Sequence, residues 1–440
     1  MRTLFGTRRR IATVVLVVGA GVALVVAGGA FGRTPDVTPA SDQPASTVDL
    51  LDRNIAQSQE RLKRLPGDWH TWASLGMAYL ERARITTDPT YYPKAEEAVR
   101  RSLQVHPEDN PDALIAQGAL ANARHDFGAA REHALAAVGI NQYSPEAYAV
   151  LTDAETQLGH PQAATEALQR LLDLRPSLSG YARASYDLEQ RGQVGEATAL
   201  MQRALDVAVS RYDIAFCRNQ LGDLALSIGD TATAADQYTA GLQADPTSIT
   251  LQRGQARLAA MTGRTADALS AYAALTRRSP TPGYLLEYAE LLRANGRDAD
   301  AQTQLRLATA AHQLFTGNGG VDGLTGAALA EATGRPADAL AEAQAEWQRR
   351  QFADVADLLG WTLHLNGRDA EALPYAQRAF DTGAQSAPYA YHLGIIQLAL
   401  GDRAGARANL TRALEISPQF SPLDAPRART ALASLTGTGS

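Results

Sequence analysis

The sequence is short of several residue types on which common kinds of site depend. Lys63 and Lys94 are its only lysines, and neither follows the glycine-rich loop that a phosphate-binding P-loop requires. The one cysteine, Cys217, excludes an intrachain disulfide and a zinc site built from several thiolates. HExxH metalloprotease and GxSxG nucleophile motifs do not occur. We therefore expect no enzymatic activity, no cofactor and no metal site.

The sequence also lacks an excess of positive charge. Its 41 Lys and Arg residues stand against 47 Asp and Glu residues, which gives a net charge of −6. Binding to nucleic acid needs a basic face. The composition therefore argues against a nucleic-acid partner. The tract GNGGVDG at 317–323 approaches a nucleotide-binding glycine pattern, but no strand precedes it, and we interpret it as a loop.

The amino terminus predicts export. Four arginines lie within residues 1–10, and no charged residue occurs from 11 to 32. As a helix, this stretch spans roughly 33 Å, enough for the hydrocarbon core of a bilayer and long for a cleaved signal. We predict a single-pass anchor at 11–32, with the basic segment 1–10 in the cytoplasm and the rest outside it. The alternative is cleavage after the small residues 28–30, which gives a secreted protein.

Two further segments have the composition of connecting chain. Residues 33–47 are rich in proline, serine, threonine and aspartate, which is typical of a tether. Residues 436–440 are small and polar, and we expect a disordered tail there. Everything between, 48–435, is assigned to one folded array.

A glycine recurs along this array with a period of about 34 residues. The intervals between successive glycines are 33, 37, 34, 33, 38, 33 and 34 residues. Such a period is typical of a repeat architecture rather than of one compact core. The glycines are Gly159, Gly192, Gly229, Gly263, Gly296, Gly334, Gly367 and Gly401.

Other residues keep a fixed distance from each glycine. An alanine stands five residues after every one, as Ala164 follows Gly159, and a small residue stands seven before, as Thr152 does. A proline closes four of the units, among them the last, at Pro418. Small residues let two helices cross closely, so each unit is expected to be a pair of antiparallel helices joined at the glycine.

This pattern resembles the tetratricopeptide repeat. The signature of that family is met most fully in the first unit, by Trp72, Leu75, Gly76, Tyr79, Ala95 and Pro107. The second unit has His125 where the turn glycine would be. The resemblance implies an all-α fold, a right-handed superhelical α-solenoid of about ten repeats with capping helices at 49–65 and 425–435. The closing stretch FSPLDAPRA at 420–428 resembles bacterial repeat-only proteins, from which no activity carries over.

In this family, the first helix of each pair lines a concave groove. Counting from the small crossing residue, positions three before, one after and four after face the groove. The candidate partner-binding residues are Asn219, Asp223, Arg253, Arg257, Glu290, Arg293, Asp357, Trp361, His364 and Tyr391.

Two features of this set have two interpretations each. Arg253 and Arg257, four residues apart, could grip one carboxylate or phosphate, or could pair with acids on adjacent repeats. Trp361 and Tyr391 could anchor a peptide, or could pack between helices. We expect a non-enzymatic scaffold, tethered to the membrane, that binds a protein or peptide in its groove. The alternative is an exported binding protein for an envelope polysaccharide or another non-protein ligand.

Overall fold

The structure is a computed structural model that describes residues 47–436. The basic segment 1–10, the anchor at 11–32, the tether up to residue 46 and the tail 437–440 lie outside the described residues. Thr47 and Thr436, assigned above to the tether and the tail, are the first and last helical residues. Among the described residues, none of the helices combines the length and the apolar character that crossing a membrane requires.

Residues 47–436 form α-helices, one short 3-10 helix and no strand. The first helices of the ten pairs are α2 (Trp69–Thr86), α4 (Pro111–Ala123), α6 (Pro145–Leu158), α8 (Leu178–Glu189), α10 (Arg211–Ser227), α12 (Ile249–Met261), α14 (Pro282–Ala294), α16 (Gly323–Ala332), α18 (Ala353–Leu365) and α20 (Ala387–Ala399). The second helices are α3 (Tyr92–Val105), α5 (Phe127–Ile140), α7 (Pro161–Leu174), α9 (Val194–Asp206), α11 (Thr231–Ala244), α13 (Thr265–Arg278), α15 (Asp298–Gly317), α17 (Pro336–Arg349), α19 (Asp369–Phe380) and α21 (Arg403–Ile416). The outer elements are α1 (Thr47–Arg64), α22 (Asp424–Thr436) and the 3-10 helix η1 (Pro89–Tyr91).

Local sequence sets where the helices begin and end. Many first helices start after a Ser, Asp or Asn cap, as α6 does after Ser144, whose side chain accepts a hydrogen bond from the Ala147 amide. Between the two helices of a pair, all eight turn glycines have positive φ, a conformation that glycine adopts without strain. His125 takes the same conformation, with φ of 61°, so the second repeat keeps the turn without its glycine.

Small residues bring the two helices of each pair together. The alanine five positions after each turn glycine is buried in all eight repeats. In the fifth pair, a Cβ atom on Gly222 would lie 2.3 Å from the ring of Tyr238. The alanine and the small crossing residue are therefore packing positions, as the sequence pattern predicts.

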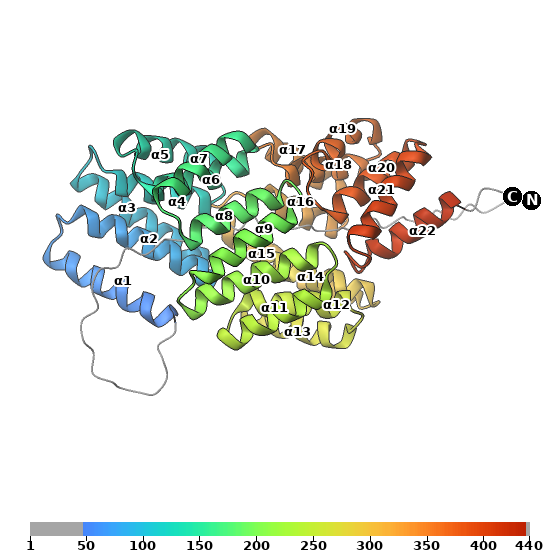
Figure 1. The fold of residues 1–440 in the computed structure, drawn as a ribbon, viewed down its shortest axis with the longest axis horizontal. Helices are drawn as coiled ribbons and strands as arrows, with labels where there is room; N and C mark the ends of the chain where they lie inside the picture. The colour runs from blue at the N-terminus through green and yellow to red at the C-terminus, as the bar shows by residue number, and fades with distance from the viewer. Residues whose placement is uncertain (1–46, 437–440) are drawn as a thin grey trace, which may run out of the picture.

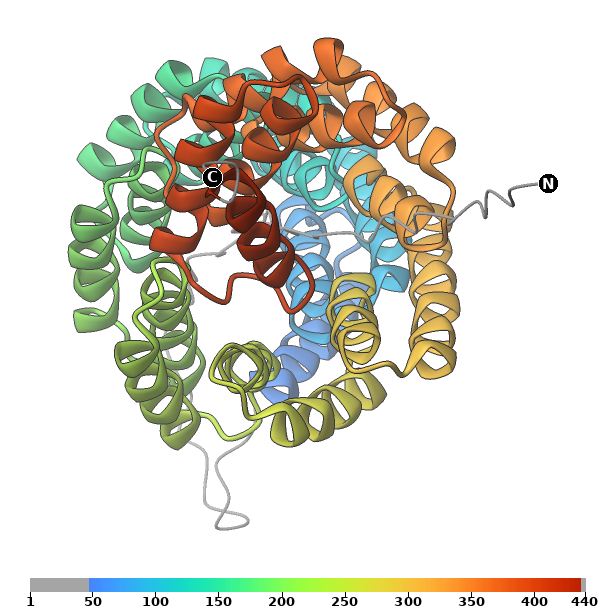
Figure 2. The same cartoon turned by 90° about the vertical axis from the view of Figure 1, so that its right-hand side faces the viewer.

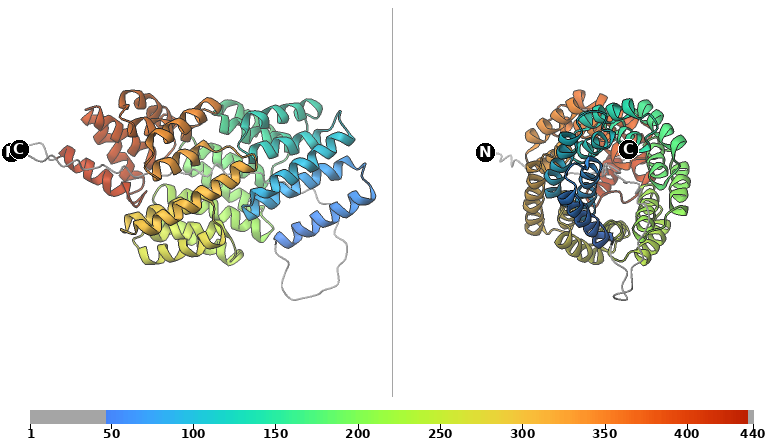
Figure 3. Two further views of the ribbon diagram at one scale, coloured as in Figure 1. Left: turned by 180° about the vertical axis from the view of Figure 1, so that it is seen from behind. Right: turned by 90° about the vertical axis from the view of Figure 1, so that its left-hand side faces the viewer.

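The pairs stack in order, and the stack coils into a ring of helices (Figures 1 and 2). Each second helix packs on the first helix of its own pair and on that of the next, as α5 does on α4 and α6. First helices of neighbouring pairs also contact one another, as α4 does with α2 and α6. We call the side of the first helices that faces the axis of the ring the inner surface (Figure 3).

The ring extends beyond one full turn, so the second superhelical turn packs on the first. The amide of Val321, before α16, donates to the carbonyl of Arg124, after α4, at 2.9 Å. The amide of Gln351, before α18, donates to the carbonyl of Leu158 at 3.2 Å. We call these turn-to-turn contacts the seam. It joins residues 124–127, 157–159, 191–192 and 229 to residues 315–322, 346–352, 383 and 416–418.

The ends of the array are covered by single helices. At the front, α1 packs on α2 through Ile55 and Leu62, which are buried. At the rear, α22 packs on α21, and Ala428 and Leu435 are buried there. Both helices lie where the sequence predicts caps.

Candidate functional site

All the candidate residues lie on first helices, and most of them already have partners within the chain. Arg253 on α12 makes a two-point ion pair with Glu287 on α14, and its Nε lies 3.1 and 3.0 Å from the two carboxylate oxygens. The Tyr272 hydroxyl donates to Glu287 at 3.1 Å. Burial alone would raise the pKa of Glu287, but the charge of Arg253 holds it below its ordinary value. Arg253 is therefore engaged in holding neighbouring repeats together.

Asp223 on α10 collects the next group of contacts. It accepts hydrogen bonds from the Tyr238 hydroxyl at 2.7 Å, from Asn219 Nδ2 at 3.0 Å and from Arg257 Nη1 at 3.4 Å. Arg257 and Arg253 thus pair with carboxylates on opposite neighbouring repeats, which is the second of the two interpretations above. Arg257 stays the more available of the two, because its side chain is 34% exposed and its ion pair is long.

The aromatic candidate Trp361 on α18 lies in a buried polar cluster. Its Nε1 donates to Glu331 Oε1 on α16 at 3.0 Å, and its ring stacks on His392 with centroids 4.2 Å apart. His392 in turn lies 2.8 Å from Asp357 through Nδ1. Burial lowers the pKa of His392, but the carboxylates of Asp357, Asp424 and Glu331 together more than offset this and raise it. Trp361 is only 4% exposed, so it packs between helices as its second interpretation states.

Two atoms of this cluster have no hydrogen-bond partner although they are buried. They are Oε2 of Glu331 and Nε2 of His392. Unpaired buried polar atoms are uncommon in folded proteins. Burial raises the pKa of Glu331 to about 8. The cluster therefore contains two polar atoms that could still form hydrogen bonds.

Tyr391 and Glu290 meet the carboxy-terminal helix. The Tyr391 hydroxyl lies 3.4 Å from Oδ1 of Asp424, and its ring contacts Phe420. Glu290 Oε1 accepts a hydrogen bond from Ser421 Oγ at 2.6 Å. Tyr391 is 3% exposed, so its ring is covered by the chain's own end.

The last two candidates lie at the ends of their helices. Arg293 donates to the carbonyl of Ala332 at 2.6 Å, and His364 pairs through Nδ1 with Asp369. These contacts link α14 to α16 and α18 to α19. Both residues are partly exposed.

Several inner-surface residues escaped the sequence analysis. Their pairs are separated by about one repeat: Arg253 and Glu287 by 34 positions, Asp357 and His392 by 35, and Glu331 and Trp361 by 30. An acid and a base about one period apart was the signal that could have found Asp153 with Arg183, Glu287 and His392, whereas Glu189, Glu331 and Asp424 have no such signal. The missed residues are Asp153, Arg183, Glu189, Glu287, Glu331, His392 and Asp424.

Glu189 on α8 differs from the paired acids, because no cation is among the groups that shift its pKa. Burial, together with the neighbouring carboxylates of Asp223 and Asp354, raises the pKa of Glu189 to about 7. Asp354 belongs to α18, so the first and second superhelical turns approach each other here.

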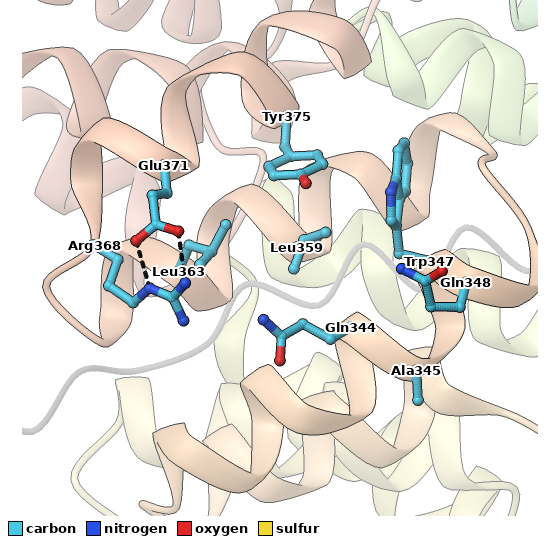
Figure 4. Close-up of a pocket in the computed structure, with 9 residues that line it drawn as sticks. All are labelled: Gln344, Ala345, Trp347, Gln348, Leu359, Leu363, Arg368, Glu371 and Tyr375. Atoms are coloured by element: carbon cyan, nitrogen blue, oxygen red, sulfur yellow. Dashed lines mark hydrogen bonds and ion pairs between the residues drawn. The ribbon is translucent and has the colours of Figure 1, made fainter.

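A separate pocket of 410 Å³ lies between α17, α18 and α19 (Figure 4). Trp347 and Tyr375 meet edge to face there, with centroids 5.3 Å apart, and the guanidinium of Arg378 lies 4.8 Å from the Trp347 ring. An ion pair between Arg368 and Glu371 closes one side. No residue predicted from the sequence lines it. The lining residues are Gln344, Ala345, Trp347, Gln348, Leu359, Leu363, Arg368, Glu371 and Tyr375.

Helix pairs of one period, stacked with their first helices facing one axis, define an α-solenoid repeat protein. The family model of the tetratricopeptide repeat matches residues 387–420, which contain the last pair, α20 and α21. The same glycine and alanine positions recur in seven further pairs. The match identifies this pair as a tetratricopeptide repeat, and proteins built from this repeat commonly bind protein partners.

Comparison with curated protein sequences gave no match. Among solved structures, the chain is similar to a thermophilic tetratricopeptide repeat protein of Thermus thermophilus, with 21% identity over 39% of this chain and 90% of that one and a TM-score of 0.35. It is also similar to the Cut9–Hcn1 hetero-tetramer of the APC/C, with 16% identity, 88% and 85% coverage and a TM-score of 0.43. The human IFIT1 dimer with m7Gppp-AAAA has 16% identity, 75% and 77% coverage and a TM-score of 0.49.

Proposed function

We propose that the chain is a non-enzymatic scaffold that binds a protein or peptide partner on its inner surface. The observation that carries this proposal is the convergence of the first helices on one axis. Side chains from distant repeats share one surface there, as the hydrogen bond between Ser421 and Glu290, 131 positions apart, illustrates. A surface of that kind suits an extended partner that contacts several repeats at once.

Co-purification from cells with a matched pair of charge reversals tests the proposal. Arg257→Glu changes the inner surface at an arginine that is 34% exposed, whereas Arg277→Glu makes the same change on α13, a second helix. We expect mass spectrometry to find a reproducible protein partner whose recovery falls at least fivefold with Arg257→Glu and stays unchanged with Arg277→Glu. Equal recovery with both variants would remove the inner surface from the proposal.

We further propose that residues 11–32 anchor the chain in the membrane, with the repeats outside the cytoplasm. The uncharged stretch that follows four arginines supports this. Protease added to intact cells or spheroplasts should digest the repeats. If the repeats are digested only after lysis, the orientation is wrong. Carbonate extraction separates the anchored form, which stays in the membrane pellet, from a secreted form released by cleavage.

The polysaccharide alternative needs exposed aromatic rings on which sugars can stack. Trp361 and Tyr391 are the aromatic candidates of the inner surface, and they are 4% and 3% exposed. Both rings are covered by other parts of the chain. A protein or peptide partner, recognised by polar and charged groups, is therefore the better supported of the two.

A further inference from the structure

The chain's own carboxy-terminal segment occupies part of the inner surface. The loop before α22 and the start of that helix lie on the inner side of the ring (Figure 2). Ser421, in this loop, accepts a hydrogen bond from the amide of Asp424 at 3.0 Å and donates to Glu290 on α14 at 2.6 Å. One hydroxyl therefore begins α22 and ties it to a helix of the seventh repeat.

A second group of contacts fixes the same segment. Asp424 is fully buried, lies 3.4 Å from the Tyr391 hydroxyl and accepts from Arg427 Nη1 at 2.8 Å. Phe420 packs against the Tyr391 ring. Residues 420–427 thus touch both α14 and α20 through polar and aromatic groups.

Capping alone does not require these contacts. A cap needs to cover the apolar side of the last pair, and α22 does so with Ala428 and Leu435, while Arg407 of α21 donates to the Leu435 carbonyl at 2.6 Å. At the other end of the array, α1 covers α2 mainly with Ile55 and Leu62. The contact with Glu290 goes beyond this task, because it reaches across the ring.

The charges around this segment are unbalanced. Glu290 and Glu331 belong to the repeats, and Asp424 belongs to the segment. The charge of Asp424 raises the pKa of both repeat carboxyl groups, whereas Arg427, which is bonded to Asp424, lowers both. Oε2 of Glu331 is buried without a hydrogen-bond partner. The segment therefore brings an arginine that interacts favourably with these two buried carboxyl groups, and a partner segment that carries a cation would be favoured there for the same reason.

We propose that the inner surface between α14, α16 and α20 is a binding site for an arginine-bearing peptide segment with a hydroxyl group, and that residues 418–427 occupy it as an internal ligand until a partner segment displaces them. This inference rests on the proposed function, because it names the place and the chemistry of the partner's contact. Ser421 and Arg427 supply in the free chain the hydroxyl and the guanidinium that the partner would supply in the complex.

A peptide-binding experiment with the full chain tests the displacement. The probe is a fluorescein-labelled synthetic peptide with the sequence of residues 418–432. In the wild type, the tethered copy has the advantage of a high effective concentration, so the probe binds weakly. Ser421→Ala with Arg427→Gln weakens the tethered copy, and we expect the probe to bind this variant at least tenfold more tightly than the wild type. Adding Glu290→Ala, which removes the acceptor of the hydroxyl group, should reverse that gain. Equal binding to the wild type and the double variant, or no effect of Glu290→Ala, would overturn the proposal.

Hydrogen exchange on a variant that leaves the segment intact provides a second test. Glu290→Ala removes the acceptor on α14 and changes nothing in α22. We expect amide exchange in α22 to accelerate at least fivefold while α20 and α21 keep their protection. Unchanged exchange in α22 would mean that the helix is only a cap. If the probe peptide does not bind the double variant, while recovery of the protein partner still depends on Arg257, this inference is refuted and the proposed function stands.

Discussion

Arg350, in the second superhelical turn, donates a hydrogen bond to the side-chain oxygen of Gln157 in the first, across 193 positions of sequence. Arg350 is 4% exposed, its guanidinium lies 5.0 Å from the Phe127 ring, and it pairs with Glu346, which is 1% exposed. In a simple solenoid, each repeat contacts only its neighbours. Here, a buried charge joins repeats that are several units apart, so the solenoid is stiffened as a closed coil.

The seam predicts unequal effects of the same substitution at two turn glycines. Gly192 and Gly263 have φ of 73° and 76°, so alanine at either position should incur the same backbone strain, about 1–2 kcal/mol. A Cβ atom on Gly192 would also lie 2.0 Å from the carbonyl oxygen of Gly383, whereas one on Gly263 meets nothing within 4 Å. We expect Gly192→Ala to destabilise the protein by about 2 kcal/mol more than Gly263→Ala.

Urea unfolding followed by circular dichroism measures the difference, and hydrogen exchange locates it. Gly192→Ala should speed exchange around Gly383 in the loop after α19, although that loop is distant in sequence. Gly263→Ala should affect only its own pair. Equal losses for the two variants would show that the turns do not press on each other at this point.

Neighbouring arginines at the seam provide another comparison. Arg349 and Arg350 both pair with Glu346, but Arg349 is 32% exposed in its side chain and Arg350 is buried. Removing one partner of a buried ion pair costs about 3–5 kcal/mol, and water around a partly exposed arginine reduces that cost. We expect Arg350→Ala to lower the unfolding midpoint markedly and Arg349→Ala to lower it little. Similar midpoints for the two variants would contradict the buried role of Arg350.

The sequence predicts the repeat fold well because the repeat is local. Turn glycine, buried alanine and closing proline are fixed by contacts within about 34 residues, so each unit shows its own helix pair. The seam has no such signal. Gly192 and Gly263 occupy the same position of the repeat, yet only Gly192 presses on another superhelical turn. That difference arises from the pitch of the coil, which accumulates over many repeats.

The candidate site shows the same limit. The position of Trp361 in its repeat places it on the inner surface, but its burial depends on His392 and Glu331 in the neighbouring repeats. Tyr391 is covered by Phe420, and Glu290 is bonded to Ser421, because the carboxy-terminal segment turns inward. Repeat position therefore predicts that these residues lie on first helices, and it does not predict which residues stay free.

The raised pKa of Glu331 predicts a pH-dependent stability. Burial raises this pKa from 4.5 to about 8, with His392, Asp424 and Arg427 as the neighbouring charged groups. Because the folded-state value is the higher one, the stabilisation is complete below about pH 4.5 and is lost as the pH rises through about 8. Glu331→Gln keeps an acceptor for Trp361 and carries no charge. Relative to the wild type, it should therefore gain about 1–3 kcal/mol between pH 6 and pH 9.

Urea midpoints of both proteins at the two pH values check this gain. Glu97→Gln is the control, because Glu97 is half-exposed and its pKa is held down, chiefly by a hydrogen bond from Arg100. The control should show no gain at high pH. If the stability of Glu331→Gln changes with pH in the same way as that of the wild type, this carboxyl is not desolvated.

The two arginines of the sixth repeat should differ in stability as well as in binding. Arg253→Ala leaves Glu287 partly buried with only the Tyr272 hydroxyl as a near donor, so we expect a loss of about 2–4 kcal/mol. Arg257→Ala leaves Asp223 with Tyr238 and Asn219, so a loss under about 1 kcal/mol is expected. Thermal unfolding of the two variants measures this. A larger loss for Arg257→Ala would reverse the assignment of Arg253 as the structural arginine.

The single cysteine offers a direct measure of local opening. Cys217 on α10 is fully buried, and burial raises its pKa to about 12, so both access and ionisation limit its reactivity. We expect a thiol reagent such as DTNB to label the native chain at pH 8 at least a hundredfold more slowly than the chain in denaturing urea, with one equivalent released at completion.

Gly229→Ala provides the comparison, because a Cβ atom there would lie 3.1 Å from the Ile416 carbonyl oxygen and strain the turn that follows α10. Labelling of Cys217 should accelerate in that variant and not in Gly401→Ala, whose turn meets no neighbour within 4 Å. Equal acceleration in both variants would mean that α10 opens without any contribution from the contact with the second superhelical turn.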